Sequence, residues 1–138
     1  MKHLLVDTNI LLDLLIDRKP FSEPAAELFE KAAEHSVKLY ASTFSVSNIY
    51  HFVRESKSHG KTIELLKDLF VFIELLEVDN LIVQEAINSA FNDFDNAVLN
   101  YCALSHSDIE AIVTRNEKDF KNSDVPVYNP MAILTMLS

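Results

Sequence analysis

Short apolar runs alternate along this chain with longer segments of helical spacing, and this alternation constrains the fold more than any other feature. The apolar runs are rich in branched residues typical of buried strands and cover residues 3–6, 37–41, 72–78, 110–114 and 125–128. The helical segments are residues 10–16, 25–33, 46–53, 62–70, 81–91 and 95–104, and a last short helix opens at Pro130. Strands that are joined through helices run parallel, and a parallel sheet is covered on both faces. The pattern therefore predicts one three-layer α/β/α domain over residues 1–138, with a mainly parallel sheet of about five strands.

The scarcity of two residue types excludes several classes of site. Gly60 is the only glycine, whereas a phosphate-cradling P-loop, a dinucleotide-binding turn and a hydrolase nucleophile elbow each need at least two. Cys102 is the only cysteine, so the chain can form neither an internal disulfide nor a Cys-x-x-Cys metal site. We expect Cys102 to be a buried, reduced thiol in a cytoplasmic protein.

The charge balance limits the partners that the chain can attract. The 12 Lys and Arg residues face 21 Asp and Glu residues, a formal net charge of −9 at pH 7. Binding to phosphates draws on clustered Lys and Arg, so a nucleic-acid partner would need a local cation. Acidic residues interrupt the first apolar run, and no uncharged stretch reaches the ~18 residues of a membrane span. We therefore expect neither a signal peptide nor a membrane segment.

Polar residues follow the predicted strands at the edge where the strands' carboxyl ends would meet. Parallel sheets bind their ligands outside these ends. The polar groups are Asp7-Thr8-Asn9, Ser42-Thr43, Asp79-Asn80, the acidic segment 92–96, and Thr114-Arg115-Asn116 with Asp119 shortly after. Converging carboxylates without positive partners repel one another unless they are protonated or bridged by a hard divalent cation. This edge therefore predicts bound Mg²⁺ or Mn²⁺, which could polarise a phosphate and activate a water molecule for attack.

Four ordered motifs make the chain similar to the PIN domain family. They are residues 6–13 (VDTNILLD), 42–44 (STF), 93–97 (DFDNA) and 113–120 (VTRNEKDF). The resemblance covers almost the whole chain and implies a PIN-like α/β/α fold with metal-dependent ribonuclease activity. VapC-like members of the family are the toxins of bacterial toxin–antitoxin pairs. The resemblance also implies four acids over the sheet edge, of which Asp7 is the first.

At the other three positions where the resemblance implies an acid, this chain has an amide, so the acidic quartet is degenerate. These positions fall on Asn48, Asn96 and Asn116, whose side-chain oxygens can bind a cation but supply no charge. Nearby carboxylates could restore the charge. By this resemblance the expected metal ligands are Asp7, Asp93, Asp95 and Asn96. The expected catalytic set is Asp7, Asn48, Asp95, Asn96, Asn116 and Asp119.

Each candidate also has a structural interpretation. Asp7 and Asp93 can cap the helices that follow them, and Asp95 can favour a helix dipole while it faces solvent. Helical spacing places Asn48 near a core-facing side, where its amide finds partners in the backbone or in a site. Asp119 can be a solvated loop charge.

The candidate partners follow from basic and apolar groups. Arg115, Lys118 and Lys121 form the basic group closest to the acidic edge, and they either contact RNA phosphates or belong to a solvated face. The apolar face of residues 62–72 is either core or a surface for self-association. The resemblance implies a homodimer and a protein antitoxin as possible partners.

Two functions fit these residues. The first is an endoribonuclease that hydrolyses RNA phosphodiester bonds with Mg²⁺ or Mn²⁺. The second is a catalytically weak or inactive PIN scaffold that binds RNA or a protein partner, and the three amides support it. Phosphoryl transfer through an aspartyl intermediate is a third class, but it calls for a second Asp two residues after Asp7, where the chain has Asn9.

Overall fold

Strands and helices alternate in the predicted order in the computed structural model, which describes residues 1–138. The strands are β1 (Lys2–Val6), β2 (Val37–Ser42), β3 (Ile73–Leu76), β4 (Ala111–Val113) and β5 (Val127–Tyr128). The helices are α1 (Thr8–Leu15), α2 (Ser22–Ala33), α3 (Thr43–Arg54), α4 (His59–Leu69), α5 (Asn80–Ile87), α6 (Phe94–Leu104) and α7 (Pro130–Leu137). A short 3-10 helix, η1 (Glu117–Phe120), follows β4.

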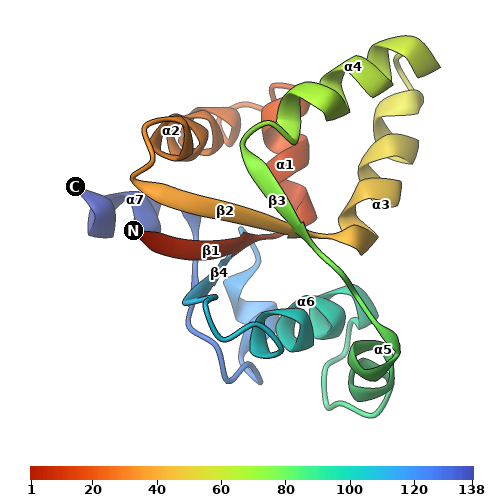
Figure 1. The fold of residues 1–138 in the computed structure, drawn as a ribbon, viewed down its shortest axis with the longest axis vertical. Helices are drawn as coiled ribbons and strands as arrows, with labels where there is room; N and C mark the ends of the chain where they lie inside the picture. Colours follow the sequence, from red (N-terminus) through yellow and green to blue (C-terminus); the bar gives the residue numbers. More distant parts are fainter.

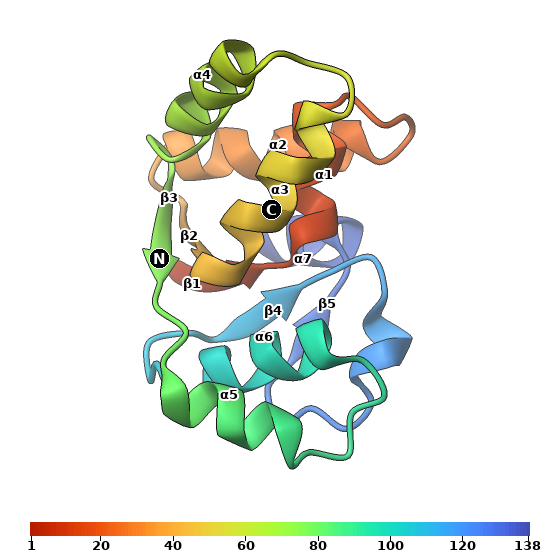
Figure 2. The same ribbon diagram turned by 90° about the vertical axis from the view of Figure 1, so that its right-hand side faces the viewer.

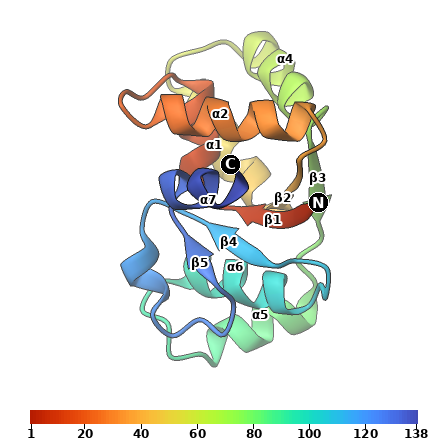
Figure 3. The ribbon, with the colours of Figure 1, turned by 90° about the vertical axis from the view of Figure 1, so that its left-hand side faces the viewer.

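All five strands pair in parallel in one sheet of order β3-β2-β1-β4-β5 (Figures 1, 2 and 3). The central strand β1 pairs with β2 on one side, where Leu4 lies opposite Leu39, and with β4 on the other, where Leu5 lies opposite Ile112. The chain proceeds outward from β1 to β2 and β3 and then returns to β4 on the other side of β1. This reversal between β1 and β4 creates the crevice in which open parallel sheets bind ligands.

Helices cover both faces of the sheet, which confirms the predicted three layers. Helices α1, α2, α3, α4 and α7 lie on one face, and α5 and α6 lie on the other (Figures 2 and 3). Successive side chains of β1 alternate between the two apolar clusters. Leu4 and Val6 belong to the cluster under the first group of helices, and Leu5 belongs to the cluster under α5 and α6.

Four elements are shorter than the sequence pattern predicts. The strands expected over residues 110–114 and 125–128 are β4, with three residues, and β5, with two. The strand expected over residues 72–78 is the four-residue β3, and the helix expected over residues 81–91 ends at Ile87. The Ser89 hydroxyl donates to the carbonyl oxygen of Ala86 at 2.8 Å and accepts from the backbone N–H of Phe91 at 3.3 Å. Such local side-chain bonds compete with helix continuation. Phe91 still packs against aromatic rings of the core from this turn, which explains its helix-like spacing.

Polar residues at the strand ends begin the following helices. Ser42 caps α3 and Asp79 caps α5, and each side chain accepts a hydrogen bond from the backbone N–H three residues on. Asp7 caps α1, and Asp93 caps α6 by accepting from the N–H of Asn96 at 3.0 Å. The capping role expected as an alternative for Asp7 and Asp93 is therefore real. Asp93 caps α6 through Oδ1 alone, whereas both carboxylate oxygens of Asp7 accept hydrogen bonds.

The apolar segment 62–72 is mostly core. Thr62, Leu66 and Leu69 are buried on the inner face of α4. Val71 and Phe72 are 72% and 47% exposed, and they precede the edge strand β3. The self-association surface considered from the sequence is thus reduced to the end of this segment.

Cys102 and the helix lengths test two further expectations. Cys102 is buried in the apolar cluster under α5 and α6, as predicted. Burial raises the pKa of its thiol to about 11, so the group is protonated at neutral pH.

None of the helices combines the length and the apolar character that crossing a bilayer requires.

Candidate active site

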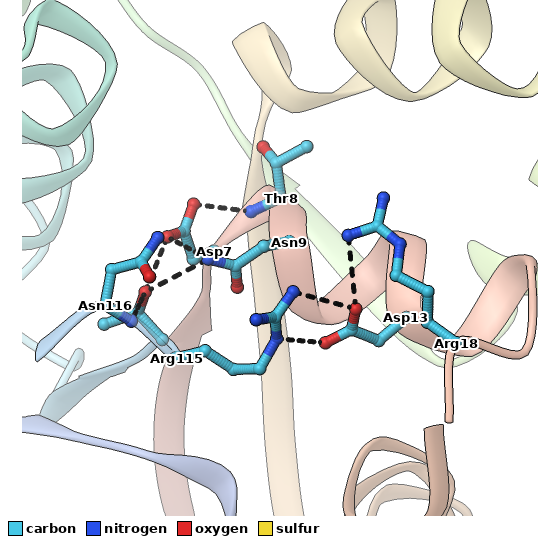
Figure 4. A network of polar contacts seen from close by, with 8 residues as sticks. Asp7, Thr8, Asn9, Asp13, Arg18, Arg115 and Asn116 are labelled. Carbon is cyan, nitrogen blue, oxygen red and sulfur yellow. Dashed lines mark hydrogen bonds and ion pairs between the residues drawn. The ribbon is translucent and has the colours of Figure 1, made fainter. Parts of the chain in front are cut away.

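Asp7 lies at the carboxyl end of β1, where the chain enters α1 (Figure 4). Its Oδ1 accepts a hydrogen bond from the backbone N–H of Thr8 at 2.7 Å. Its Oδ2 accepts one from the Thr114 hydroxyl at 2.7 Å and a longer one from the Asn9 amide at 3.3 Å. The backbone N–H of Asp7 donates to the carbonyl oxygen of Val113 at 2.9 Å. The ends of β1 and β4 together therefore fix the orientation of this carboxylate.

Burial raises the pKa of Asp7 above its ordinary value, because the charged carboxylate loses contact with water. Hydrogen bonds from Thr114 and from the backbone of Thr8 lower the pKa by favouring the charged form. The negative charges of Asp93 and Asp95 raise it again. The start of α6 therefore lies within electrostatic reach of the end of β1.

An open cavity of about 490 Å³ contains Asp7 and faces α1, α3 and the start of α6. Its lining is mostly polar and consists of Asp7, Thr8, Asn9, Leu12, Asn48, His51, Phe52, Glu55, Asp93, Asp95, Asn96 and Asn116. Four of these residues are carboxylates and none is Lys or Arg. The cavity therefore concentrates negative charge at the switch point of the sheet.

A larger cavity of about 650 Å³ lies away from these residues and is less suited to chemistry. Eight of its eleven lining residues are hydrophobic, among them Met1, Val71 and Phe72. Glu74 and Lys38, the charged residues in its lining, are already paired at 3.4 Å. The smaller acidic cavity is therefore the candidate active site.

Most of the predicted site residues converge on the acidic cavity. Those that line it are Asp7, Asn48, Asp93, Asp95, Asn96 and Asn116. They come from four separate parts of the chain and meet only because β1 and β4 are neighbours in the sheet and α3 and α6 begin at the same edge. The roles that the sequence assigned to them in metal binding and catalysis stay predictions.

Asp119 does not line the cavity, although the sequence predicts a role for it there. It is an exposed residue of η1. The prediction assumed that one helical turn would bring Asn116 and Asp119 to the same side. Asn116 precedes η1 with a non-helical backbone, φ −109° and ψ 47°, and it lines the cavity, whereas Asp119 is absent from the lining. The structure gives no support to Asp119 as a site residue.

Asn48 is exposed, whereas its spacing predicted a position near the core. The buried residues of α3 are Ser45, Ile49 and Val53. Asn48 lies on the neighbouring face, which borders the cavity and also carries His51, Phe52 and Glu55. These residues follow Asn48 by three, four and seven positions, the spacing of one helix face. That spacing is the sequence signal from which Phe52 and Glu55 could have been found.

Arg115 is engaged within the protein. Its Nε donates to Oδ2 of Asp13 at 2.6 Å, and its Nη2 donates to Oδ1 at 3.1 Å (Figure 4). Its guanidinium carbon also lies 4.0 Å from the ring centroid of Phe21. The prediction that Arg115 contacts nucleic acid therefore has no support in the structure. Lys118 and Lys121 are exposed, and their contact with RNA stays a prediction.

The oxygen donors of the cavity fit a hard divalent cation in their chemistry. Carboxylate and amide oxygens are the ligands that Mg²⁺ and similar ions take in proteins. Asn9 Oδ1 is a buried oxygen without a hydrogen-bond partner. No three His, Cys, Asp or Glu side chains form one metal-binding cluster, so the acids alone do not complete a site. Amide oxygens such as those of Asn96 and Asn9 would have to supply the remaining ligands.

The sheet order and the acidic cavity at its switch point define an α/β/α domain with a carboxylate-lined site at the strands' carboxyl ends. The chain matches the model of the PIN domain family over residues 3–118 and belongs to that family. The nucleases of this family generally use divalent metal ions. This membership confirms the resemblance that the four sequence motifs indicated.

Solved structures of similar fold include proteins of toxin–antitoxin systems. VapBC2 from Rickettsia felis, bound to a promoter DNA fragment, aligns with a TM-score of 0.70 and 14% identity over 92% of this chain and 98% of that chain. DNA-bound VapBC from Salmonella typhimurium aligns with a TM-score of 0.70 and 15% identity over 94% of this chain and 99% of that chain. VapC20 from Mycobacterium tuberculosis, a toxin that cleaves the sarcin–ricin loop, aligns with a TM-score of 0.60 and 12% identity over 79% of this chain and 86% of that chain. At these identities the likeness shows the fold. No curated protein matches the chain in sequence.

Proposed function

We propose that this protein is a divalent-metal-dependent endoribonuclease that hydrolyses RNA phosphodiester bonds with Mg²⁺ or Mn²⁺. One observation carries the proposal: in a PIN domain, the cavity at the switch point of the sheet is lined by four carboxylates and by no Lys or Arg. Carboxylates gathered without positive partners are stabilised by a bridging cation of high charge.

Asp7 is the central ligand in this proposal. Its hydrogen bonds to Thr8 and Thr114 hold the carboxylate in one orientation before any ligand arrives. Asp93, Asp95 and Asn96 would hold the same ion from α6 (Phe94–Leu104) and the residue that caps it. A bound divalent cation would supply Lewis-acid polarisation of the phosphate and would lower the pKa of an attacking water.

Two cavity amides have supporting roles. Asn116 would orient the attacking water from the segment after β4, and Asn48 would contribute its amide oxygen from α3. Each amide binds a cation without neutralising it. The site should therefore bind its metal more weakly than one with four acids.

The similar proteins support RNA as the substrate and an antitoxin as the partner. VapC20 is described as a toxin that cleaves the sarcin–ricin loop, and the VapBC structures contain toxin–antitoxin pairs. We extend both to this chain as part of the proposal, with the chain as the toxin and a homodimer as its assembly. Sedimentation of the purified protein, alone and with a candidate antitoxin, tests the assembly.

The activity test is RNA cleavage with added Mg²⁺ or Mn²⁺ by the wild type, Asp7→Asn and Asp79→Asn. Asp79 is the matched control, because it also caps a helix that follows a strand but does not line the cavity. Asn is about as good a helix cap as Asp, so both variants should fold. Asp7→Asn should abolish metal-dependent cleavage, and Asp79→Asn should retain it. Retained cleavage in a folded Asp7→Asn protein would refute the assignment.

A second function has its own support in the structure. No three acids form a metal cluster, and amides occupy three positions where the family resemblance expects acids. These observations favour a PIN scaffold that binds RNA or a protein partner without cleaving RNA. RNA binding by the wild type that persists without any metal-dependent cleavage would select this second function.

A further inference from the structure

Arg18 carries a positive charge that the protein does not neutralise. The Asp13 carboxylate, which is fully buried, already accepts two hydrogen bonds from Arg115. Arg18 makes a single ion-pair contact of 3.5 Å with the same carboxylate, and none of its side-chain N–H groups has a hydrogen-bond acceptor in the structure. One carboxylate thus faces two arginines, which leaves this group a net charge of +1. The Arg18 side chain is 34% exposed, so this charge is accessible.

The surplus charge lies against a wall of the acidic cavity. The guanidinium carbon of Arg18 is 5.2 Å from the ring centroid of Phe52, which is 40% exposed and lines the cavity from α3. An exposed aromatic ring is a platform on which an unpaired base can stack, and an arginine beside it can hold the strand's phosphate. Arg18 and Phe52 therefore present, side by side, the two groups that bind one nucleotide.

The charge of the cavity explains why such a pair would be needed. Its four carboxylates repel an approaching RNA backbone, so a strand requires a cation outside the carboxylate cluster. The chain has three arginines. Arg115 is held by Asp13, and Arg54 donates to the carbonyl oxygen of Lys57 at 2.7 Å. Arg18 is the arginine that contacts a cavity residue while its hydrogen-bond donors stay free.

The position of this pair separates it from the carboxylates. Asp13 lies six residues after Asp7, which corresponds to ~9 Å along α1 at the rise of an α-helix. Figure 4 shows the Arg18 guanidinium beside the Asp13 carboxylate, apart from the Asp7 carboxylate. A group bound at Arg18 would thus be a neighbour of the phosphodiester that reaches Asp7.

We propose that Arg18 and Phe52 form a nucleotide subsite for single-stranded RNA, in which Phe52 stacks an unpaired base and Arg18 binds a phosphate of the same strand. The subsite rests on the proposed function, because the strand it holds is the one whose phosphodiester enters the acidic cavity. It makes Arg18 and Phe52 determinants of strand binding rather than of bond cleavage.

The test measures binding of a fluorescein-labelled single-stranded oligoadenylate by anisotropy, in EDTA, to the full chain carrying Asp7→Asn. Adding Phe52→Leu, which removes the ring but keeps an apolar side chain, should weaken binding about 5- to 150-fold, the range for loss of one base stack. Adding Arg18→Gln should weaken binding and lower the slope of log affinity against log salt by about 0.7, the value for one phosphate contact on a single strand. Arg18→Lys should retain most of that slope.

Two matched controls show whether the effects belong to this subsite. Phe21 is 42% exposed and also lies against an arginine, but it does not line the acidic cavity, so Phe21→Leu should leave binding unchanged. Lys67→Gln removes one exposed charge from α4 and should not change the salt slope.

Each outcome decides for or against the subsite. Three results would overturn the subsite. They are equally strong binding of duplex RNA, no binding of the oligoadenylate by the Asp7→Asn parent at low salt, and unchanged binding in Phe52→Leu and Arg18→Gln. Cleavage by the wild type is a separate readout. Subsite-dependent binding without cleavage refutes the nuclease proposal alone, whereas cleavage with unaffected binding refutes the subsite alone.

Discussion

Arg115 and Asp13 form a two-point ion pair between residues 102 positions apart in the chain, with donor–acceptor distances of 2.6 and 3.1 Å. The pair attaches the segment after β4 to the last turn of α1. Thr114, which precedes Arg115, donates to Asp7, and Asn116, which follows it, lines the acidic cavity. Thr114 thus bonds to the residue that caps α1, Arg115 bonds to the last turn of α1, and Asn116 forms part of the cavity wall.

Removing the Asp13 charge should destabilise the protein strongly. Asp13→Asn leaves Arg115 and Arg18 without a charged partner around a fully buried position. We expect a loss of about 2–3 kcal/mol in the free energy of unfolding, below the ~3–5 of a fully buried pair because both arginines are partly exposed. Urea denaturation at pH 7 measures this loss. The exposed control Asp68→Asn should stay within about 0.5 kcal/mol of the wild type, and equal stability of Asp13→Asn and wild type would contradict the role of the pair.

The raised pKa of Asp7 makes the stability of the metal-free protein depend on pH. The folded carboxyl group keeps its proton to a higher pH than the unfolded one, so its favourable contribution is present at low pH and is lost as the pH rises through the folded pKa. Asn at this position does not titrate. As the pH rises from acidic to neutral in EDTA, the melting temperature of the wild type should therefore fall relative to that of Asp7→Asn. A difference that is constant with pH would contradict the pKa direction.

Loss of the Thr114 hydroxyl should make metal binding more sensitive to acid. The hydroxyl lowers the pKa of Asp7, so Thr114→Val should raise that pKa further. Protons compete with a metal ion for a carboxylate, and the pH midpoint of Mn²⁺ binding should therefore move upward. Thr62→Val is the control, since Thr62 is equally buried and its hydroxyl bonds to the Ser58 carbonyl far along the chain from the site. If the midpoint in Thr114→Val is the same as in the wild type and in Thr62→Val, Asp7 does not bind the ion.

Restoring an acid at position 96 should improve the site. Asn96→Asp adds a carboxylate to the cavity that Asp7, Asp93 and Asp95 already line. Because the number of charged ligands sets the affinity of oxygen sites for hard cations, we expect Mn²⁺ to bind at least about tenfold more tightly. Without metal, the added repulsion should lower the melting temperature. Calorimetry and thermal denaturation measure the two effects, and a variant with lower stability but unchanged affinity would place the ion elsewhere.

The fold could be predicted from the sequence because its signals are local. Each buried strand shows as a run of branched residues, and the periodicity changes between strands and helices along one stretch of chain. The error over residues 81–91 arose where a side-chain bond of Ser89 ended α5, a feature that apolar spacing does not record.

The site could be predicted only in part, because its key contacts are long-range. Asp7 and the segment 93–96 were found because the end of a strand and the start of a helix are visible in the sequence. The ion pair between Asp13 and Arg115 was missed, and its only signal is an acid among the leucines of α1. Asp119 does not line the cavity, and its role in catalysis stays a prediction.

Calorimetric titration of Mn²⁺ into the wild type and into Asp7→Asn tests the central claim most directly. We predict a saturable Mn²⁺ site in the wild type that is lost in the folded Asp7→Asn variant, because Asp7 is the cavity carboxylate that the ends of β1 and β4 hold in place. No detectable site at millimolar Mn²⁺, or the same binding by both proteins, would contradict it.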